Sequence, residues 1–278
     1  MTFAVQVRGL SKRYGQLQAV RNVDLDVGYG EVFAILGPNG AGKSTTIEIL
    51  EGHRKRDSGQ VSVLGEDPAT AGRSWRAKIG IVLQEVSDAG MLTVTETLQM
   101  FAKCYGNARD PSELLKLVGL SSVSGSKVRT LSGGQRRRLD VALGIINSPT
   151  LLFLDEPTTG FDPEARLRFW SLIELLARTG TTILLTTHYL EEAAALADRV
   201  AVIAGGQLVA VDSPQNLIRY VDSTATVRWR VASAIHTEHT DRPTELIRQR
   251  SLAGEELVDL TVSRPTLEDA YLQLIGMR

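Results

Sequence analysis

The chain has 278 residues, of which 43% are hydrophobic and 23% are charged, and its formal net charge at pH 7 is -1. This length is enough for one large domain, or for one principal domain with a small appendage, and for a sizeable core. Because acids and bases are interspersed and nearly balanced, the composition excludes a global attraction to nucleic acid or to an anionic membrane. Any anion site must therefore be built locally.

A single cysteine, Cys104, excludes an internal disulfide and a zinc site built from cysteines. We predict that it fills the core. The first residues lack the charged head and long apolar run of a secretory signal, and no apolar run approaches the roughly 18 residues that cross a bilayer. If the protein acts at a membrane, we expect another chain to supply the membrane-spanning part.

The N-terminal residues alternate between apolar and polar side chains, first at Val5 and Val7 and then over 23–27, which predicts two half-buried antiparallel strands. Further along, four apolar runs are continuous, which indicates strands covered on both faces. These runs span residues 32–36, 151–154, 182–187 and 200–204. Helical patterns lie between them, including 165–178, where we expect one face to carry Leu167, Trp170, Leu172, Ile173 and Leu176. The pattern predicts an α/β core with a parallel sheet.

Residues 84–146 interrupt this rhythm with helix-like segments and turn residues, which predicts a mostly helical subdomain inserted between strands of the sheet. After residue 220 the pattern changes again, and strand-like and helix-like segments follow one another. The strand-like segments are 226–232 and 257–263, a helical segment is 244–250, and the last helix, 267–276, places Leu267, Tyr271, Leu274 and Ile275 on one face. We therefore predict a principal domain over residues 1–220 and a small β/α appendage over 221–278.

The stretch GPNGAGKST follows the predicted strand 32–36 and precedes a helical pattern, which is the context of a phosphate-binding P-loop. Its glycines would let backbone N–H groups turn inward around phosphates, and the following helix would add its N-terminal partial charge. Lys43 would reach the outer phosphates and the Ser44 hydroxyl would ligate Mg²⁺. A plain glycine turn is the alternative, but motif and context together favour a phosphate site. The predicted loop comprises Gly37, Pro38, Asn39, Gly40, Ala41, Gly42, Lys43, Ser44 and Thr45.

Two adjacent acids end the apolar run 151–154. Asp155 is predicted to lie at the carboxyl edge of the sheet beside the P-loop and to hold Mg²⁺, directly or through water. Glu156 would point elsewhere and polarise the attacking water as a general base. These acids could merely end a strand, but solvation alone explains them poorly after a fully apolar run.

His188 follows the predicted strand 182–187, at the edge where ligands of open α/β sheets gather, and Gln84 is similarly placed at the end of the run IGIVLQ, 79–84. A lone histidine is commonly a surface or satisfied residue, but the position of His188 favours contact with the γ-phosphate. Gln84 could contribute an amide oxygen to Mg²⁺ or to the water. Taken alone, Gln84 is a weak signal.

These motifs, together with LSGGQ at residues 131–135, resemble the ATP-binding cassette (ABC) ATPases. The resemblance covers roughly residues 1–220 and implies an ATPase with ATP as its nucleotide and Mg²⁺ as its metal. It also implies catalytic roles for Glu156, His188, Gln84 and Lys43. The ordered set is Tyr14, the P-loop, Gln84, LSGGQ, Asp155 and Glu156, Asp162 and His188.

In this family two cassettes pack head to tail, so the resemblance implies that LSGGQ completes the site of a partner cassette. The residues that would cap the partner's γ-phosphate are Ser132, Gly133, Gly134 and Gln135. Two exposed glycines at a helix N-terminus suit a phosphate that lacks cover on one side. By the same resemblance Tyr14 would stack on adenine, although it could instead cap the first sheet, and Asp162 would lie at the dimer seam.

The sequence resembles the daunorubicin-resistance and multidrug branch of ABC exporters at residues 158–166, 186–210 and 264–276. That resemblance implies a homodimer or heterodimer of ATPase subunits on the cytoplasmic face of the cell membrane, held there by a separate permease. The permease would dock in a groove of the helical subdomain within 85–105, which Met91, Leu92, Val94, Leu98 and Phe101 could line although most of them are core candidates.

Three alternatives stay open at this point: a soluble ABC ATPase that acts on ribosomes or nucleic acid, the ATPase of an importer, and a regulatory module that binds ATP without hydrolysing it. The first alternative is suggested by two basic runs, 136–138 and 53–56, which could bind nucleic acid. Because neither run is interleaved with aromatic residues and the chain is near neutral, we interpret them as solvated faces with support for phosphate, and we expect no specific nucleic acid.

Overall fold

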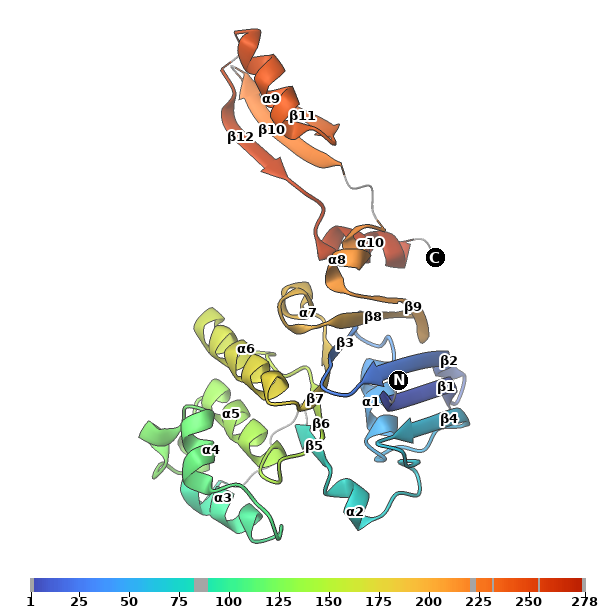
Figure 1. Cartoon of the computed structure of the whole chain (residues 1–278), viewed down its shortest axis with the longest axis vertical. Coiled ribbons are helices and arrows are strands. Elements are labelled where there is room, and N and C mark those ends of the chain that lie inside the picture. The colour runs from blue at the N-terminus through green and yellow to red at the C-terminus, as the bar shows by residue number, and fades with distance from the viewer. Residues whose placement is uncertain (1–2, 83–89, 221–223, 232, 255, 277–278) are drawn as a thin grey trace. The chain divides into compact units, whose positions relative to one another are not determined.

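The computed structural model describes residues 3–82, 90–220, 224–231, 233–254 and 256–276 (Figure 1). The chain divides into two compact units, Met1–Val211 and Asp212–Arg278. Gln84, a predicted Mg²⁺ ligand, and Glu85, the first residue of the predicted groove segment, lie outside the described residues. Within the described parts of the chain, no helix combines the length and the apolar character that crossing a bilayer requires.

The N-terminal strands β1 (Phe3–Tyr14) and β2 (Leu17–Gly28) pair in antiparallel fashion, as predicted. A third strand that was not predicted, β4 (Ser58–Val63), pairs with the other edge of β1. Its alternation is short, with only Val61 and Val63 buried. The apolar side chains of this sheet, including Val5 and Val7, are buried in the same core cluster as residues of the parallel sheet.

The main sheet has six strands in the order β5-β6-β7-β3-β8-β9. The pairings from β5 through β8 are parallel, which confirms the predicted parallel sheet. The strands β3, β6 and β7 are almost wholly buried, which explains their continuous apolar runs. The strand bounds are β5 Ile79–Val82, β6 Leu151–Asp155, β7 Thr182–Thr187, β3 Val32–Leu36, β8 Arg199–Ala204 and β9 Gln207–Asp212.

Helices α1 (Lys43–Leu50), α6 (Pro163–Arg178) and α7 (Leu190–Leu196) follow strands of this sheet, and α2 (Arg73–Arg76) precedes β5. The predicted buried face of α6 was wrong at one end, because Leu167 is 58% exposed. Trp170 is only half-buried. The buried stripe instead begins with Ala165 and runs at helical spacing, so that its members are Ala165, Phe169, Leu172, Ile173 and Leu176.

Residues 90–146 contain helices α3 (Val94–Ala102), α4 (Pro111–Leu117) and α5 (Gly133–Gly144), which Figure 1 shows together in green beside the parallel sheet. Two single turns of 3₁₀ helix, Ser121–Val123 and Val128–Thr130, connect α4 to α5. The helix α3 begins at a capping box between Thr93 and Glu96. The carboxylate of Asp110 caps α4.

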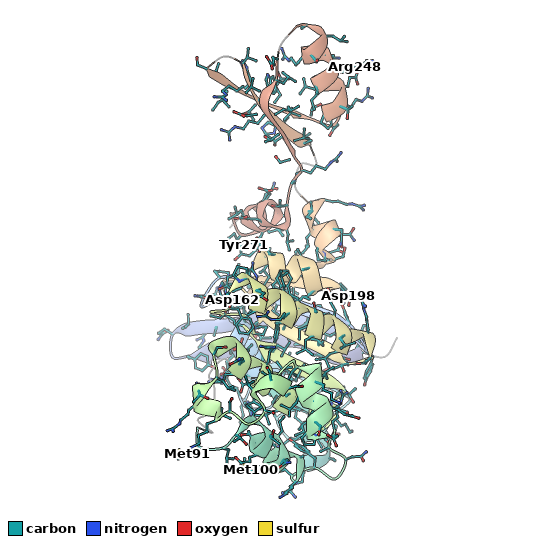
Figure 2. The ribbon with its side chains drawn as sticks, turned by 90° about the vertical axis from the view of Figure 1, so that its left-hand side faces the viewer. Met91, Met100, Asp162, Asp198, Arg248 and Tyr271 are labelled. Carbon is teal, nitrogen blue, oxygen red and sulfur yellow. The ribbon has the colours of Figure 1, made fainter. Side chains whose placement is uncertain are left out.

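Several side chains of this subdomain were considered as groove residues or core fillers. Val94 and Leu98 are fully buried and therefore belong to the core. Met91 is 71% exposed, and so is, to 46%, Met100, which was not among the predicted groove residues (Figure 2). The prediction that Cys104 fills the core was wrong, because this residue is exposed just beyond the end of α3.

The C-terminal unit holds a three-stranded antiparallel sheet in the order β11-β10-β12, with β10 at Ala225–Val231, β11 at Ala234–Thr240 and β12 at Val258–Ser263. The strand β11 was not predicted, because its sequence AIHTEHT is polar and largely exposed. The other elements are α8 (Pro214–Ile218), α9 (Pro243–Leu252) and α10 (Leu267–Gly276). The predicted face of α10 is its less exposed face, with Leu267 and Ala270 buried. The functional division at residue 220 stays a prediction.

Candidate active site

The P-loop joins β3 to α1, and its backbone requires glycine at two places. Gly42 has φ 101°, and a Cβ atom there would lie 2.3 Å from the main-chain oxygen of Ala19. A Cβ atom on Gly37 would lie 2.3 Å from the main-chain oxygen of Ile203. Gly42 is also the N-cap of α1, so no side chain covers the first N–H groups of this helix. The loop therefore presents a helix N-terminus suited to an anion.

Lys43, the first residue of α1, is buried with 3% of its surface exposed. Its ammonium group donates hydrogen bonds to the main-chain oxygens of Gly37 at 2.9 Å and Pro38 at 3.2 Å. It also lies 3.5 Å from Oε1 of Glu156. These oxygens stabilise a cation that burial would otherwise make costly, and they hold it within the loop.

Asp155 ends β6 at the same edge of the sheet as the P-loop. The hydroxyl of Ser44 lies 3.5 Å from Oδ1 of Asp155. The hydroxyl of Thr186, on the neighbouring strand β7, donates a hydrogen bond to Oδ1 of Asp155 and accepts one from the backbone N–H of Glu156 at 3.0 Å. Thr186 thus orients both acids, and sequence reasoning missed it because it reads as one of two threonines ending an apolar run.

Glu156 has a positive φ of 43°, which is uncommon for a residue other than glycine. Its backbone leaves the line of β6, and its carboxylate lies between two cationic or protonatable groups. Oε1 faces Lys43, as described above, and Oε2 lies 3.2 Å from Nδ1 of His188. Such a strained conformation costs on the order of 1–3 kcal/mol and persists only where the surroundings impose it. The structure thus brings Lys43, Asp155, Glu156 and His188 together from three elements.

The interpretation of residues 136–138 as a solvated face was wrong for its central member. Arg137 is 5% exposed, and burial lowers the pKa of its guanidinium. The guanidinium donates hydrogen bonds to the main-chain oxygens of Asp155 at 2.7 Å and Pro157 at 3.1 Å. Arg138 bonds the main-chain oxygens of Val118 and Gly119. Arg137 therefore fastens α5 to the segment that carries the two acids, whereas Arg138 fastens α5 to the end of α4.

The LSGGQ stretch begins α5. Ser132 is the N-cap, and it forms a reciprocal capping box with Gln135, with hydrogen bonds of 3.2 Å and 2.9 Å. A Cβ atom on Gly133 would meet nothing within 4 Å, and one on Gly134 would approach only the Cβ atom of Ala165 at 3.4 Å. Nothing in the described part of this unit therefore demands glycine at position 133 on steric grounds.

The remaining predicted site residues lie at the ends of other elements. Tyr14 ends β1 and is 38% exposed. Asp162 is the N-cap of α6, where its carboxylate accepts a hydrogen bond of 2.7 Å from the backbone N–H of Ala165. The role of Asp162 at a dimer seam stays a prediction. Within its own chain the structure shows that Asp162 caps α6.

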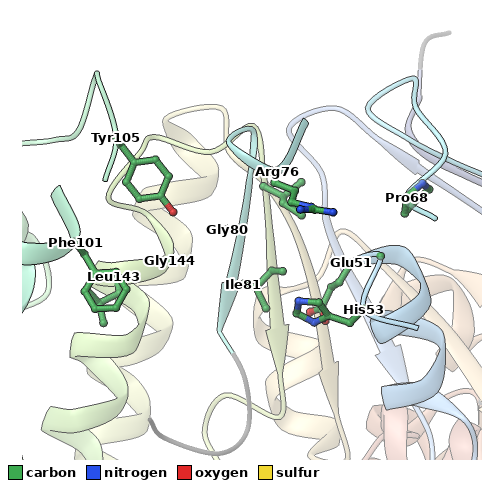
Figure 3. Close-up of a pocket in the computed structure, with 12 residues that line it drawn as sticks. Glu51, His53, Pro68, Arg76, Gly80, Ile81, Phe101, Tyr105, Leu143 and Gly144 are labelled. Atoms are coloured by element: carbon green, nitrogen blue, oxygen red, sulfur yellow. The ribbon is translucent and has the colours of Figure 1, made fainter. Parts of the chain in front are cut away.

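A cavity of about 460 Å³ lies between the end of α1, the strand β5 and the helices α3 and α5 (Figure 3). Its lining includes the buried carboxylate of Glu51, and also His53, Arg76, Phe101 and Tyr105. Burial, followed by the charges of Asp155 and Glu48, raises the pKa of Glu51 to about 8. A carboxyl group whose ionisation is disfavoured by burial therefore faces a cleft beside α1, and sequence reasoning did not identify it.

Comparison with protein families gives a match over residues 20–159, about half of the chain, to the family described as ABC transporter. A shorter match, over residues 127–192, is to the family described as AAA domain, putative AbiEii toxin, Type IV TA system. Both matches fall in the unit that holds the site.

The chain is similar over nearly its whole length to curated proteins. It is 38% identical to the daunorubicin resistance ATP-binding protein DrrA2 of Streptomyces coeruleorubidus, covering 99% of this chain and 96% of that protein. It is 34% identical to the Nod factor export ATP-binding protein I of Burkholderia orbicola, covering 98% and 97%. A solved ATP-binding cassette, a dimer in a post-hydrolysis state with ADP and phosphate, is 26% identical with a TM-score of 0.67, covering 75% of this chain and 98% of that one. The chain belongs to the ABC transporter family and is one of its ATPases.

Proposed function

We propose that this chain is the ATPase subunit of an exporter that moves drugs, lipids or other amphipathic compounds through a separate membrane permease. One observation carries the catalytic part of the proposal, namely the carboxylate of Glu156 placed between Lys43 and His188 and next to Asp155. Similarity to proteins named for daunorubicin resistance and for Nod factor export supports the direction of transport.

The P-loop residues 37–45 would bind the phosphates of ATP. The N–H groups at the start of α1 point to this role, because Gly42 leaves them free of a capping side chain. Lys43 would exchange its contacts with the loop carbonyls for the outer phosphates. Tyr14, exposed at the end of β1, would stack on the adenine ring.

Ser44 and Asp155 fit a hard divalent cation, because they bring a hydroxyl and a carboxylate oxygen within 3.5 Å of each other at the mouth of the P-loop. We propose that these two residues hold Mg²⁺, together with Gln84, which lies outside the described residues. When bound, Mg²⁺ would neutralise charge on the phosphates. Thr186 would keep the Asp155 carboxylate turned toward Ser44.

Glu156 would act as general base and accept the proton of the attacking water. Its unusual backbone turns the carboxylate away from the line of β6 and toward the P-loop side, where it contacts Lys43. His188 lies on the other side of the carboxylate and would orient it while contacting the γ-phosphate. The positions of these side chains at one edge of the sheet support both assignments.

Two such cassettes would close head to tail, with residues 132–135 of each capping the γ-phosphate that the other binds. The open space at Gly133 supports this role, because a glycine without a steric requirement in its own unit suits close approach by a ligand. Each ATP would then be buried between two chains, so that binding free energy becomes dimerisation free energy.

The cavity beside Glu51 is the proposed docking site for a cytoplasmic segment of the permease. It lies against the helical subdomain, and its lining includes Phe101, which falls within the predicted groove segment 85–105 (Figure 3). This docking would place the chain on the cytoplasmic face of the cell membrane. The basic clusters are engaged in internal hydrogen bonds and ion pairs, which weakens the alternative that they bind nucleic acid.

The conservative change Glu156→Gln tests the catalytic proposal. We expect the variant to bind ATP, to lose at least 100-fold in turnover, as loss of a general base does, and to accumulate as an ATP-bound dimer in size-exclusion chromatography. Glu164→Gln, an exposed glutamate on α6, is the matched control and should behave as wild type. Turnover near the wild-type rate in Glu156→Gln would contradict the proposal.

A further inference from the structure

The basic segment 53–56 (HRKR) does not form one free cationic face. Three of its four residues pair with acids, two at the end of α1 and one after β4. These pairs are His53 with Glu51, Arg54 with Glu48, and Arg56 with Asp67. The segment therefore makes three separate side-chain pairs with the rest of the domain.

Arg54 is tied at two places. Its guanidinium pairs with Glu48 on the helix α1, the same helix that begins with Lys43. Its Cζ atom also lies 5.3 Å from the centroid of the Tyr14 ring, within the range of a cation–π interaction. Arg54 thus connects the P-loop helix to the aromatic side chain at the end of β1.

Asp57, the residue directly after the basic segment, holds the backbone that carries Tyr14. The carboxylate of Asp57 accepts a hydrogen bond of 2.7 Å from the backbone N–H of Arg13 and pairs with Lys12 at 2.7 Å. The Lys12 ammonium lies 5.5 Å from the Tyr14 ring centroid. The two contacts of Asp57 hold β1 immediately before Tyr14, whereas Arg54 contacts the Tyr14 ring itself.

We propose that Arg54 is a positioning residue that holds the Tyr14 ring ready to stack on the adenine of ATP. The inference rests on the proposed role of Tyr14. A tyrosine that is 38% exposed at a strand end can adopt several rotamers, and fixing it before the ligand arrives lowers the ordering cost of binding. Because Glu48 lies on α1, the ion pair between Arg54 and Glu48 would also hold the Tyr14 ring at a fixed distance from the phosphate site.

The test compares a ligand that has adenine with one that lacks it. Affinities of the full-length chain for ATP and for inorganic tripolyphosphate, both with Mg²⁺, are measured by calorimetry for wild type, Arg54→Ala, Arg54→Lys and Lys55→Ala. Lys55 is exposed in the same segment, so its variant removes an equal charge. We expect Arg54→Ala to weaken ATP binding by about 2- to 10-fold, the size of a cation–π contact, with no change for tripolyphosphate.

The other variants sharpen this expectation. Arg54→Lys keeps a cation near the ring and should recover part of the loss, whereas Lys55→Ala should match wild type. In hydrolysis assays the effect of Arg54→Ala should appear in KM and not in kcat. Equal weakening of both ligands, unchanged ATP affinity, or tighter ATP binding would each overturn the inference.

Tyr14→Ala separates this inference from the proposed function. Tyr14→Ala could weaken the binding of ATP but not of tripolyphosphate, while Arg54→Ala changes neither affinity. In that case the adenine-stacking role of Tyr14 is supported and only the role of Arg54 is wrong. If Tyr14→Ala affects both ligands equally, the stacking role itself is wrong and the role of Arg54 is overturned with it. In the double variant, Arg54→Ala should add no further loss to Tyr14→Ala.

Discussion

The buried guanidinium of Arg137, on the helix that LSGGQ begins, donates a hydrogen bond of 2.7 Å to the main-chain oxygen of Asp155, at the end of the strand that carries both acids. A second bond reaches the main-chain oxygen of Pro157. These bonds join a helix of the inserted subdomain to the edge of the parallel sheet where Asp155 and Glu156 lie. A displacement of α5 would therefore act on the backbone that positions Glu156.

We predict that Arg137→Ala destabilises the fold by about 2–4 kcal/mol, because it removes a donor from two main-chain oxygens, one buried and one partly buried, and opens a cavity. Urea unfolding at equilibrium measures this change. Arg168→Ala is the matched control, since Arg168 forms an exposed ion pair with Glu164 one turn away on α6, and it should cost less than about 0.5 kcal/mol. A loss in Arg137→Ala no larger than the control would show that these bonds contribute little.

We predict that Ser132→Arg abolishes ATP turnover and spares ATP binding by the monomer, because the bulky cation would block the partner's phosphate. Ser132→Ala removes the hydroxyl alone, with its N-cap bond, at a cost of about 1 kcal/mol, and with its proposed phosphate contact. It therefore separates these losses from the block by the added cation. Mixing Ser132→Arg chains with Lys43→Ala chains should restore at most one composite site per heterodimer. Normal hydrolysis by Ser132→Arg alone would show that this stretch does not complete a partner's site.

We predict that the stability difference between Glu51→Gln and wild type depends on pH. Burial raises the pKa of Glu51 to about 8 from an ordinary 4.5, so its contribution to stability is fully present below pH 4.5 and is lost as pH rises through 8. Glutamine stays neutral throughout. When the pH is raised from 5 to 8.5, the free energy of unfolding of Glu51→Gln should therefore increase relative to that of wild type, by an amount on the order of a few kcal/mol.

Urea unfolding of both proteins at the two pH values measures this gain. Glu113→Gln, at an exposed position in the first turn of α4, is the control and should track wild type at both. A constant difference between Glu51→Gln and wild type would mean that Glu51 titrates alike in the folded and unfolded chain.

Local sequence was sufficient wherever a segment's own pattern determines its state. The buried strands of the parallel sheet were predicted because their continuous apolar runs are explained only by burial on both faces. The P-loop was predicted because glycine, lysine and serine at fixed spacing between a strand and a helix meet a local requirement. The strand β11 was missed because its polar residues gain stability from pairing with β10 and not from burial of their own.

The site divides in the same way. The sequence by itself determined which chemical groups the chain offers, namely Lys43, Ser44, Asp155, Glu156 and His188, and that parallel strands would deliver them to one edge. Only the tertiary structure decided that Thr186 orients both acids, that Arg137 is buried against them, and that Arg54 meets Tyr14. These contacts join residues that are distant along the chain, and their partners depend on which strands and helices become neighbours. No local pattern of side chains encodes that choice.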